Sequence, residues 1–480
     1  MANGPTILTR RAHPATSAAV AATVAAAADR VIAEGETKEE SRAGIDRPAN
    51  LALVGCGAQG YWLLTNAVRV PGLAVKALCD IWSPRRQRAH DFLKGWLGAE
   101  PKAVADWRQL VDDKSIDAVL LAVPDALHAE MACAFLKAGK HVYCEAMMAP
   151  TIEGARAMVL AARAAKRTLH VGHQRRSSPL YQLAYEFLHL KESEEVKKTC
   201  PHWTHIGRLT HARVQYNRNG SGRLPADPDE DFDCRPWGYE TMAHLRDWRL
   251  YRKHGGGWMA DLGSHQIDLL NWMLDGTPGM LMGSAGLDHY VHETDAAGKT
   301  LPPRDWFDSI LTMLEYPDRR AGRGAIRVQQ QIYTTNGFDE MYEQFMGDEG
   351  TLFVGGDGAW VYREEGKISS AKVEEEKKRA KGGAQLVTAM GRTLRGGGVL
   401  EVLQKRDQGK KLETVMGRDA LLTKPEHRYA LEDFAHSIAT GAPPPCSPEA
   451  AFATAVICIR AGEAALKGER VDFKPEDFKV

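Results

Sequence analysis

Between residues 51 and 145, short apolar runs alternate with segments of helical pattern, and this alternation constrains the fold more than any other feature of the chain. The runs are continuously apolar, which is typical of strands buried on both faces. Helices of ten or more residues between such strands form the connections of a parallel sheet. The pattern therefore predicts an α/β fold with a doubly wound parallel sheet. The runs are LALVG, VKALCD, IDAVLLAV and HVYCE, and the helical patterns lie at 58–70, 83–97 and 126–138.

After residue 172 the pattern changes to a series of strand candidates with few helices between them. Such a series favours a large, open and mostly antiparallel sheet in a second, α+β domain. We predict a first domain at 49–172 and a second at 173–480, with mobile charged and glycine-rich insertions at 366–411 and C-terminal helices at 425–475 that pack back on the body. The strand candidates lie at 208–216, 279–287, 308–316, 324–335 and 343–355.

A glycine-rich turn, GCGAQG at 55–60, follows the first apolar run and opens the first helix. Glycines there permit a tight turn and the close approach of a pyrophosphate to the positive N-terminus of the helix. Asp80 ends the second strand, where a carboxylate binds both ribose hydroxyls and repels a 2′-phosphate. This Rossmann pattern predicts NAD as the cofactor, although Arg85 and Arg86 could accept the phosphorylated form. The predicted binding residues in the turn are Gly55, Gly57, Ala58, Gln59 and Gly60.

A second constellation lies at 255–274, where three glycines precede a helical pattern. Asp261, His265 and Asp268 stand at i, i+4 and i+7 and therefore share one helix face. A histidine beside a carboxylate is suited to act as general base, removing a hydroxyl proton as hydride leaves the carbon. Two other interpretations stay open, a solvated helix surface and a metal site shared by His and Asp. Because no third ligand has an evident spacing, no metal is predicted.

Bulk composition excludes several classes of function. Lys+Arg and Asp+Glu number 62 each, so no net charge favours a phosphate backbone, and we find no helix-turn-helix or zinc-finger pattern. We therefore expect no nucleic acid among the partners. The eight cysteines are far apart and form no C-x-x-C, which argues against a structural zinc or a disulfide framework. No apolar stretch after the N-terminal region reaches the length of about 18 residues that a membrane span needs.

The N-terminal region is interpreted as a leader. Arg10 and Arg11 precede an alanine-rich stretch that ends in small residues near Ala28, the layout of a twin-arginine export signal over 1–29. Residues 30–48 are charged and turn-rich and are predicted to be a linker. This layout predicts a periplasmic protein exported in the folded state. The alternative is a cytoplasmic protein with a disordered or weakly helical leader.

Taken together, these motifs resemble those of the glucose-fructose oxidoreductase, inositol dehydrogenase and rhizopine-catabolism (Gfo/Idh/MocA) family. In that family the first domain binds NAD(P), and the second supplies an open sheet that forms a substrate wall and an oligomer interface. The resemblance implies an NAD-dependent oxidoreductase acting on a sugar or glycoside hydroxyl, and a homo-oligomer formed through the second sheet. The segments that carry it are GCGAQG, AVPDALHAE (122–130), GKHVYCEAMMA (139–149), VGHQRR (171–176) and DLGSHQID (261–268).

Carried over by position, the resemblance also implies roles for single residues. Asp125 and His128 would border the adenine and ribose side of the cofactor, and Glu145 would reach the nicotinamide ribose. Asp261 and His265 would face the substrate hydroxyl.

The chain departs from the family at residue 146. The family usually reads Glu-Lys-Pro where this chain has Glu145, Ala146 and Met147. The lysine would donate to the substrate oxygen, and losing such a group typically costs about 10²- to 10⁴-fold in rate. Three explanations stay open. His265 with Asp261 carries the proton alone; or the protein is a redox-neutral glycosidase that keeps NAD bound and oxidises, eliminates, hydrates and reduces; or the alanine is an engineered replacement.

Polar and aromatic residues of the second domain favour a carbohydrate, because aromatic faces stack on sugar C–H surfaces while arginines bind hydroxyls. Trp248 alone is more typical of core packing than of a sugar platform. A non-catalytic NAD- and sugar-binding regulator is the competing class of function. The predicted substrate-binding residues are His173, Tyr216, Arg218, Trp248 and Arg249.

Overall fold

The computed structural model describes twelve stretches of the chain: 47–98, 100–189, 206, 208–224, 232–295, 297–319, 324–348, 350–355, 358–363, 389–390, 416–417 and 424–480. The predicted export leader, nearly all of the predicted linker and nearly all of the predicted insertions at 366–411 lie outside them. These three therefore stay predictions. Within the described stretches, no helix has the length and apolar character needed to cross a membrane.

The first domain is built on a six-stranded parallel sheet with the order β3-β2-β1-β4-β5-β6. Its central strands are buried along nearly their whole length because helices cover both faces, as the continuous apolar runs predicted. The predicted doubly wound sheet is confirmed. The strands are β1 (Ala49–Val54), β2 (Leu73–Cys79), β3 (Lys102–Val104), β4 (Ala118–Leu121), β5 (His141–Cys144) and β6 (Leu169–Val171).

Helices on the two faces of this sheet bury separate cores. On one face α2 and α3 bury Leu63, Leu64 and Leu93, and on the other face α5 and α6 bury Phe135 and Met158. Each helix follows directly on the carboxyl end of a strand, so the helix N-termini gather at one edge of the sheet. The helices are α2 (Ala58–Ala67), α3 (Ser83–Leu97), α4 (Arg108–Val111), α5 (Asp125–Lys137) and α6 (Ile152–Ala165).

The second domain holds a ten-stranded, mostly antiparallel sheet in which β7 and β10 form a parallel pair. The single strand predicted at 343–355 is wrong, because the chain turns back between Gly347 and Gly350 and makes a β11–β12 hairpin. The strands are β7 (Leu209–Asn217), β8 (Met280–Gly286), β9 (Ser309–Pro317), β10 (Ala325–Tyr333), β11 (Met341–Gly347), β12 (Gly350–Gly355), β13 (Gly358–Arg363), β14 (Ala389–Met390), β15 (Met416–Gly417) and β16 (Arg470–Asp472).

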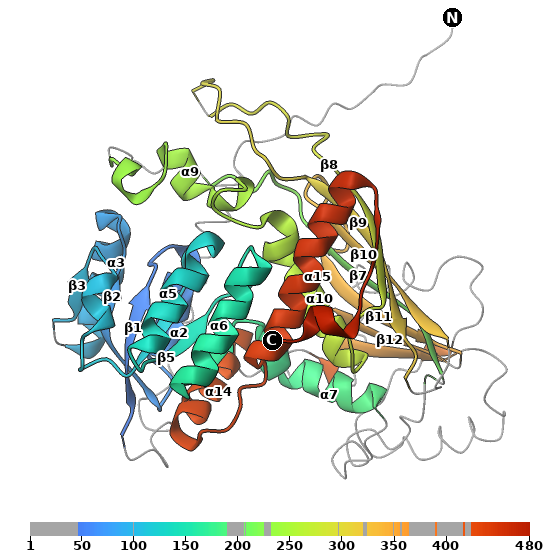
Figure 1. Cartoon of the computed structure of the whole chain (residues 1–480), viewed down its shortest axis with the longest axis horizontal. Coiled ribbons are helices and arrows are strands. Elements are labelled where there is room, and N and C mark those ends of the chain that lie inside the picture. Colours follow the sequence, from blue (N-terminus) through green and yellow to red (C-terminus); the bar gives the residue numbers. More distant parts are fainter. Residues whose placement is uncertain are drawn as a thin grey trace, which may run out of the picture.

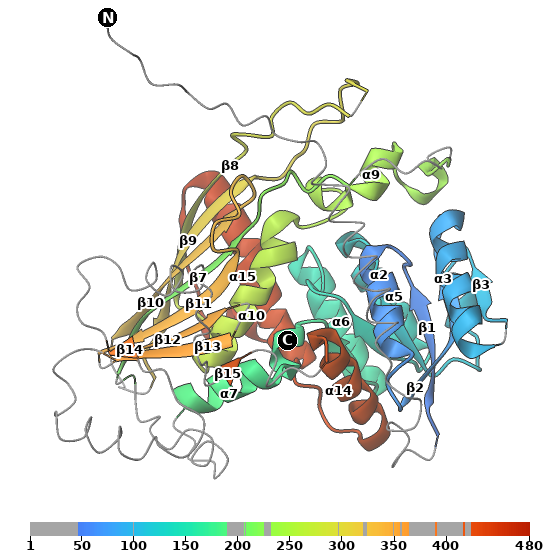
Figure 2. The same cartoon turned by 180° about the vertical axis from the view of Figure 1, so that it is seen from behind.

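Two helices from the end of the chain join the domains. Leu431 and Phe434 of α14 enter the core that α2 forms on the first domain, while α15 packs against α6, α10 and the large sheet. Figures 1 and 2 show α10 and α15 between that sheet and the first domain. The helices are α7 (Pro179–Leu188), α9 (Met242–Arg246), α10 (Ser264–Met273), α14 (Glu426–Thr440) and α15 (Pro448–Lys467), with short turns η1 (Gln174–Ser177), η2 (Arg235–Trp237), η3 (Trp248–Leu250), η4 (Met259–Gly263) and η6 (Pro475–Phe478).

Candidate active site

The glycine turn has the shape that a pyrophosphate needs. Gly55 has a φ of +93°, and a Cβ on it would lie 2.2 Å from the carbonyl oxygen of Ala122. A Cβ on Gly60 would lie 1.8 Å from the carbonyl oxygen of Gly55, so only glycine lets α2 start this close to β1. The helix begins at Ala58, directly after Gly57. The turn therefore presents a helix N-terminus through a backbone with no obstructing side chains.

Asp80 stands beside this turn at the end of β2. Its carboxylate accepts hydrogen bonds from the backbone nitrogens of Cys56 at 2.7 Å and Trp82 at 2.8 Å. Burial raises the pKa of Asp80, and the two backbone donors oppose that shift. Arg86 donates to the carbonyl oxygen of Asp80, and the Arg85 guanidinium lies over the Trp82 ring at 4.6 Å. The acid predicted to bind ribose is thus held in place by the turn itself.

Glu145 links the glycine turn to the end of β5. Its Oε1 accepts from Gln59 Nε2 at 2.9 Å, so the fifth residue of the glycine motif positions the carboxylate. Gly172 makes room for it, since a Cβ there would lie 2.6 Å from Glu145 Oε2. Burial raises the pKa of Glu145 to about 7, with a smaller contribution from the charge of Asp261. The peptide bond that follows, from Ala146 to Met147, is cis.

Asp125 is the first residue of α5 and touches the second domain. Its Oδ2 accepts from the backbone nitrogen of Gly256 at 3.1 Å. Burial raises the pKa of Asp125 to about 7, and the charge of Asp261 adds to that effect. The glycines that begin the second constellation therefore lie against the first domain.

His128 is buried, and both of its ring nitrogens lie 2.9 Å from backbone carbonyl oxygens, those of Met147 and Val123. Burial lowers the pKa of His128. The ring therefore ties the loop after β4 to the loop after β5, and its nitrogens are engaged within the protein. Its predicted place on the adenine and ribose side of the cofactor stays a prediction.

The predicted Asp261–His265 dyad does not form in this geometry. Residues Met259–Gly263 make a π-helical turn, which is wider than an α-helical turn and breaks the i, i+4 alignment assumed for the face. Asp261 pairs instead with Arg249, at 3.4 Å between Oδ2 and Nε. Among the hydrogen bonds of the described residues, none joins Asp261 to His265, and Nδ1 of His265 has no partner.

His265 lies against a second histidine that sequence reasoning assigned to the substrate. The ring centroids of His265 and His173 are 5.4 Å apart in an edge-on arrangement. Burial lowers the pKa of His265 well below its usual value, and the nearby His173 and Arg175 lower it further. His173 is only 1% exposed. Its predicted role in substrate binding stays a prediction.

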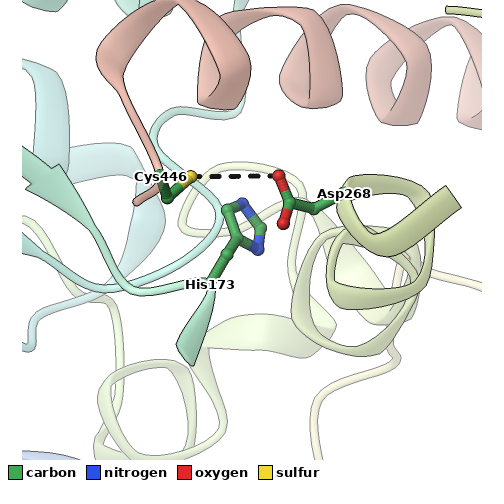
Figure 3. Close-up of side chains that lie close together, drawn as sticks. All are labelled: His173, Asp268 and Cys446. Carbon is green, nitrogen blue, oxygen red and sulfur yellow. Dashed lines mark hydrogen bonds between the residues drawn. The ribbon is translucent and has the colours of Figure 1, made fainter. Parts of the chain in front are cut away.

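Asp268, the third member of the predicted helix face, is buried and paired within the protein. Both of its oxygens accept from Arg176, at 2.8 and 2.9 Å, and Oδ1 also accepts from Thr454. Figure 3 shows its neighbours His173 and Cys446, and the thiol of Cys446 donates to Oδ1 at 3.8 Å.

The potential ligand atoms of His173, Asp268 and Cys446 lie within 4.8 Å of one another, but their chemistry fits an internal charge pair better than a metal centre. The Arg176 guanidinium already balances the carboxylate, and burial followed by Asp268 raises the pKa of the Cys446 thiol, which keeps it protonated.

The remaining predicted substrate residues differ in their surroundings. Tyr216 on β7 is half-buried, and its pKa is raised by burial first and then by the nearby Asp261 and Glu343. Arg218 is exposed and lies over the Trp258 ring at 5.2 Å. Trp248 packs on Gly255, where a Cβ would come within 2.7 Å of its ring. Tyr216 and Arg249 are therefore near Asp261, whereas Trp248 is chiefly a packing residue.

A buried ion pair that the sequence did not predict lies near Tyr216. Arg175 Nη1 donates to Glu343 Oε1 at 2.5 Å, and the Tyr181 hydroxyl donates to Glu343 Oε2 at 3.0 Å. The pair connects η1 to β11 across 168 positions of sequence. The run of two arginines in VGHQRR was a signal, but its partner on β11 could not be read from local pattern.

Models of one oxidoreductase family match both domains. The model for its NAD-binding Rossmann fold matches residues 49–173, and the model for its C-terminal alpha/beta domain matches residues 230–473.

Individual relatives share a modest part of the sequence. The 1,5-anhydro-D-fructose reductase of Ensifer adhaerens is 32% identical over 227 residues, which are 47% of this chain and 56% of that protein. A glycosyl hydrolase family 109 protein of Solibacter usitatus is 27% identical over 279 residues, 56% of this chain and 58% of that protein. The chain thus spans little more than half the length of these relatives. The structure of levoglucosan dehydrogenase with NADH and L-sorbose shares the fold, with a TM-score of 0.63 at 20% identity over 89% of this chain and 99% of that one.

Proposed function

Because the chain belongs to the Gfo/Idh/MocA oxidoreductase family, we propose that it is an NAD-dependent enzyme that oxidises or reduces a sugar at a hydroxyl-bearing carbon. One observation carries the proposal. Asp261 of the second domain lies close enough to Asp125 and Glu145 of the first domain for its charge to raise the pKa of both. The hydrogen bond from the Gly256 nitrogen to Asp125 Oδ2 at 3.1 Å also supports a position of this π-helical turn beside the cofactor edge of the parallel sheet.

Each residue then has a distinct task. The glycine turn and Asp80 hold the pyrophosphate and the ribose, and NAD, when bound, supplies the hydride acceptor. His265 is neutral at neutral pH because burial lowers its pKa, so a ring nitrogen can accept the hydroxyl proton. Asp261 and Arg249 form a charged pair that orients substrate hydroxyls. His265 then performs the proton transfer that the family's lysine would perform, because Ala146, at the position of that lysine, has no titratable group.

The proposed substrate class rests on the polar residues near Asp261 and on the names of the relatives. Tyr216, Arg249 and Asp261 offer a hydroxyl, a guanidinium and a carboxylate within one region, a set suited to several hydroxyl groups in fixed positions. Two relatives are named as a 1,5-anhydro-D-fructose reductase and a levoglucosan dehydrogenase, and both names refer to anhydro sugars, which are pyranose rings without a free anomeric hydroxyl. We therefore propose a pyranose or glycoside as the substrate.

The test is to incubate the purified protein with NAD and a panel of anhydro sugars, free pyranoses and aryl glycosides. Absorbance of the reduced nicotinamide and release of the aryl group are followed together. Accumulation of NADH with an anhydro sugar or pyranose is the expected result. If NADH binds but no member of the panel reacts, the proposal fails in favour of a binding or regulatory protein.

A redox-neutral glycosidase is the second candidate. Ala146 favours it, because it removes the lysine expected of a conventional dehydrogenase, and one relative is named as a glycosyl hydrolase. In that reaction the carbon oxidised first is reduced again after elimination of the aglycone and addition of water. The same assay separates the two candidates, since aryl release without net NADH supports the glycosidase.

The large sheet supports a homo-oligomer. One face packs on α10 and α15, and no described helix covers the other (Figures 1 and 2). On β9, Met313 is 54% exposed, and its cross-strand neighbour on β8 is Met282, which is 36% exposed. Paired methionines on an open sheet face form an adaptable apolar contact. We propose that a second copy of the chain covers this face.

Placing a charge on that face is expected to separate the copies. Met313→Lys buries an ammonium group at the interface, so the mass measured by sedimentation should fall to that of the monomer. Val291→Lys is the matched control, because Val291 is exposed to a similar degree but lies in the loop after β8. An unchanged mass for Met313→Lys, or a monomeric unmodified protein, would rule out the interface.

A further inference from the structure

A small hydrophobic cluster joins the two domains away from their main cores. Trp82 of the first domain is 2% exposed because the second domain packs against it. The second-domain members all come from one segment, residues 232–256, which we call the cover segment. Its buried members in the cluster are Cys234, Tyr239, Met242 and Leu245, with Phe232 and Trp237 partly buried beside them.

The cluster lies at the ribose-binding end of the cofactor site. The backbone nitrogen of Trp82 donates to the Asp80 carboxylate, so the indole and the acid belong to the same turn. Tyr239 lies near that acid, because burial and then the charge of Asp80 raise the pKa of its hydroxyl. In both views α9, which lies inside the cover segment, is above the edge formed by α3 and α5 (Figures 1 and 2).

The other end of the cover segment is fastened to the start of α5, at the carboxyl end of β4. The carbonyl oxygen of His254 accepts from the backbone nitrogen of Ala126 at 3.2 Å, and the Gly256 nitrogen donates to Asp125. The His254 ring packs on Tyr239 with centroids 4.6 Å apart, which connects the two attachments. The segment therefore crosses the carboxyl edge of the parallel sheet between two points of contact.

We propose that residues 232–256 form a cover over bound NAD that must lift for the nucleotide to enter or leave. A dinucleotide at the glycine turn extends from Asp80 toward Glu145, along the edge that the segment crosses. The contacts that hold the cover down are mostly apolar side chains, so burial of their surface favours the closed state. The cover then slows both the entry and the release of the nucleotide. This inference rests on the proposed function for its cofactor but not for its substrate.

Nucleotide exchange tests the cover without any sugar. NADH fluorescence in a stopped-flow instrument gives the association rate constant, and displacement by excess NAD gives the dissociation rate constant. Leu245→Ala removes a buried side chain of the cluster that joins the cover segment to Trp82, so both rate constants should rise by about tenfold while the dissociation constant changes less than about twofold. Trp237→Ala, which trims a partly buried side chain, should give the same pattern more weakly and guards against loss of folding in the first variant.

The pattern of the two rate constants decides the outcome. Leu466→Ala, at an exposed position of α15, is the control and should leave both constants unchanged. If dissociation alone accelerates, or if neither constant changes in correctly folded variants, the cover is refuted. Absence of NADH binding by the unmodified protein overturns both the cover and the cofactor assignment. A protein that binds NADH but converts no sugar contradicts the proposed function only, and the exchange rates still decide the cover.

Discussion

Replacing His265 with asparagine is expected to reduce sugar turnover by about 10³-fold, within the range typical of a lost general base. NADH affinity should stay unchanged. Asparagine occupies similar space and keeps a polar group, but it has no basic nitrogen. Because Ala146 offers no second proton carrier, nothing nearby is expected to compensate. The measurements are kcat with the best sugar of the panel and the dissociation constant of NADH, and His211→Asn, on the exposed surface of β7, is the control.

The dependence of turnover on pH gives a second test of the role of His265. The pKa of His265 is lowered by burial first and by His173 and Arg175 next, and the neutral form is the active one. Activity should therefore persist below the ordinary histidine pKa of about 6.5 and fall only when pH passes through the lower folded-state value. Any step near pH 7 belongs to Asp125 and Glu145, whose pKa burial raises to about 7, and should remain visible in NADH binding by His265→Asn. Near-normal turnover in that variant would refute the assigned role.

The first domain could be predicted closely because its signals are local. Continuous apolar strands, helical periods between them and the GCGAQG turn each occupy fewer than about 20 residues, and short-range sterics decide them. Even the strand-end acid Asp80 follows from its place after β2. The Gln59–Glu145 hydrogen bond does not, because it joins positions 86 residues apart that meet only when β1 and β5 lie in the same sheet.

The fold class of the second domain could be predicted from the sequence, but the arrangement of its site residues could not. An ideal helix period placed Asp261, His265 and Asp268 on one face, yet Asp261 lies in a π-helical turn and pairs with Arg249, while Asp268 pairs with Arg176. Nothing in the local composition distinguishes this turn from an α-helical one. Burial could not be predicted from local pattern either, and His173, which the sequence assigns to the substrate, is only 1% exposed. Long-range packing, more than propensity, decides which polar groups face the cleft.

The second large effect is expected on stability, from the loss of Asp268. The sequence predicts that Asp268 shares a helix face with Asp261 and His265, but in the structure it forms a buried ion pair with Arg176. Asp268→Ala leaves the Arg176 guanidinium without its carboxylate in a region of low exposure. Breaking a buried pair in this way typically costs about 3–5 kcal/mol, whereas an exposed pair contributes about 0–1 kcal/mol. The expected result is a large fall in the free energy of unfolding, measured with urea.

Glu463→Ala is the matched control, because its pair with Arg460 is exposed on α15 and should contribute little. Acid should reproduce the Asp268 effect. Burial alone would raise the pKa of Asp268, but Arg176 and His173 lower it below the ordinary value. The pair therefore stabilises the fold above the unfolded-state pKa of about 3.9, and this stability is lost as pH falls through the folded-state value. If Asp268→Ala and Glu463→Ala unfold at the same urea concentration, the buried pair is not what holds α10, the helix that carries His265, in place.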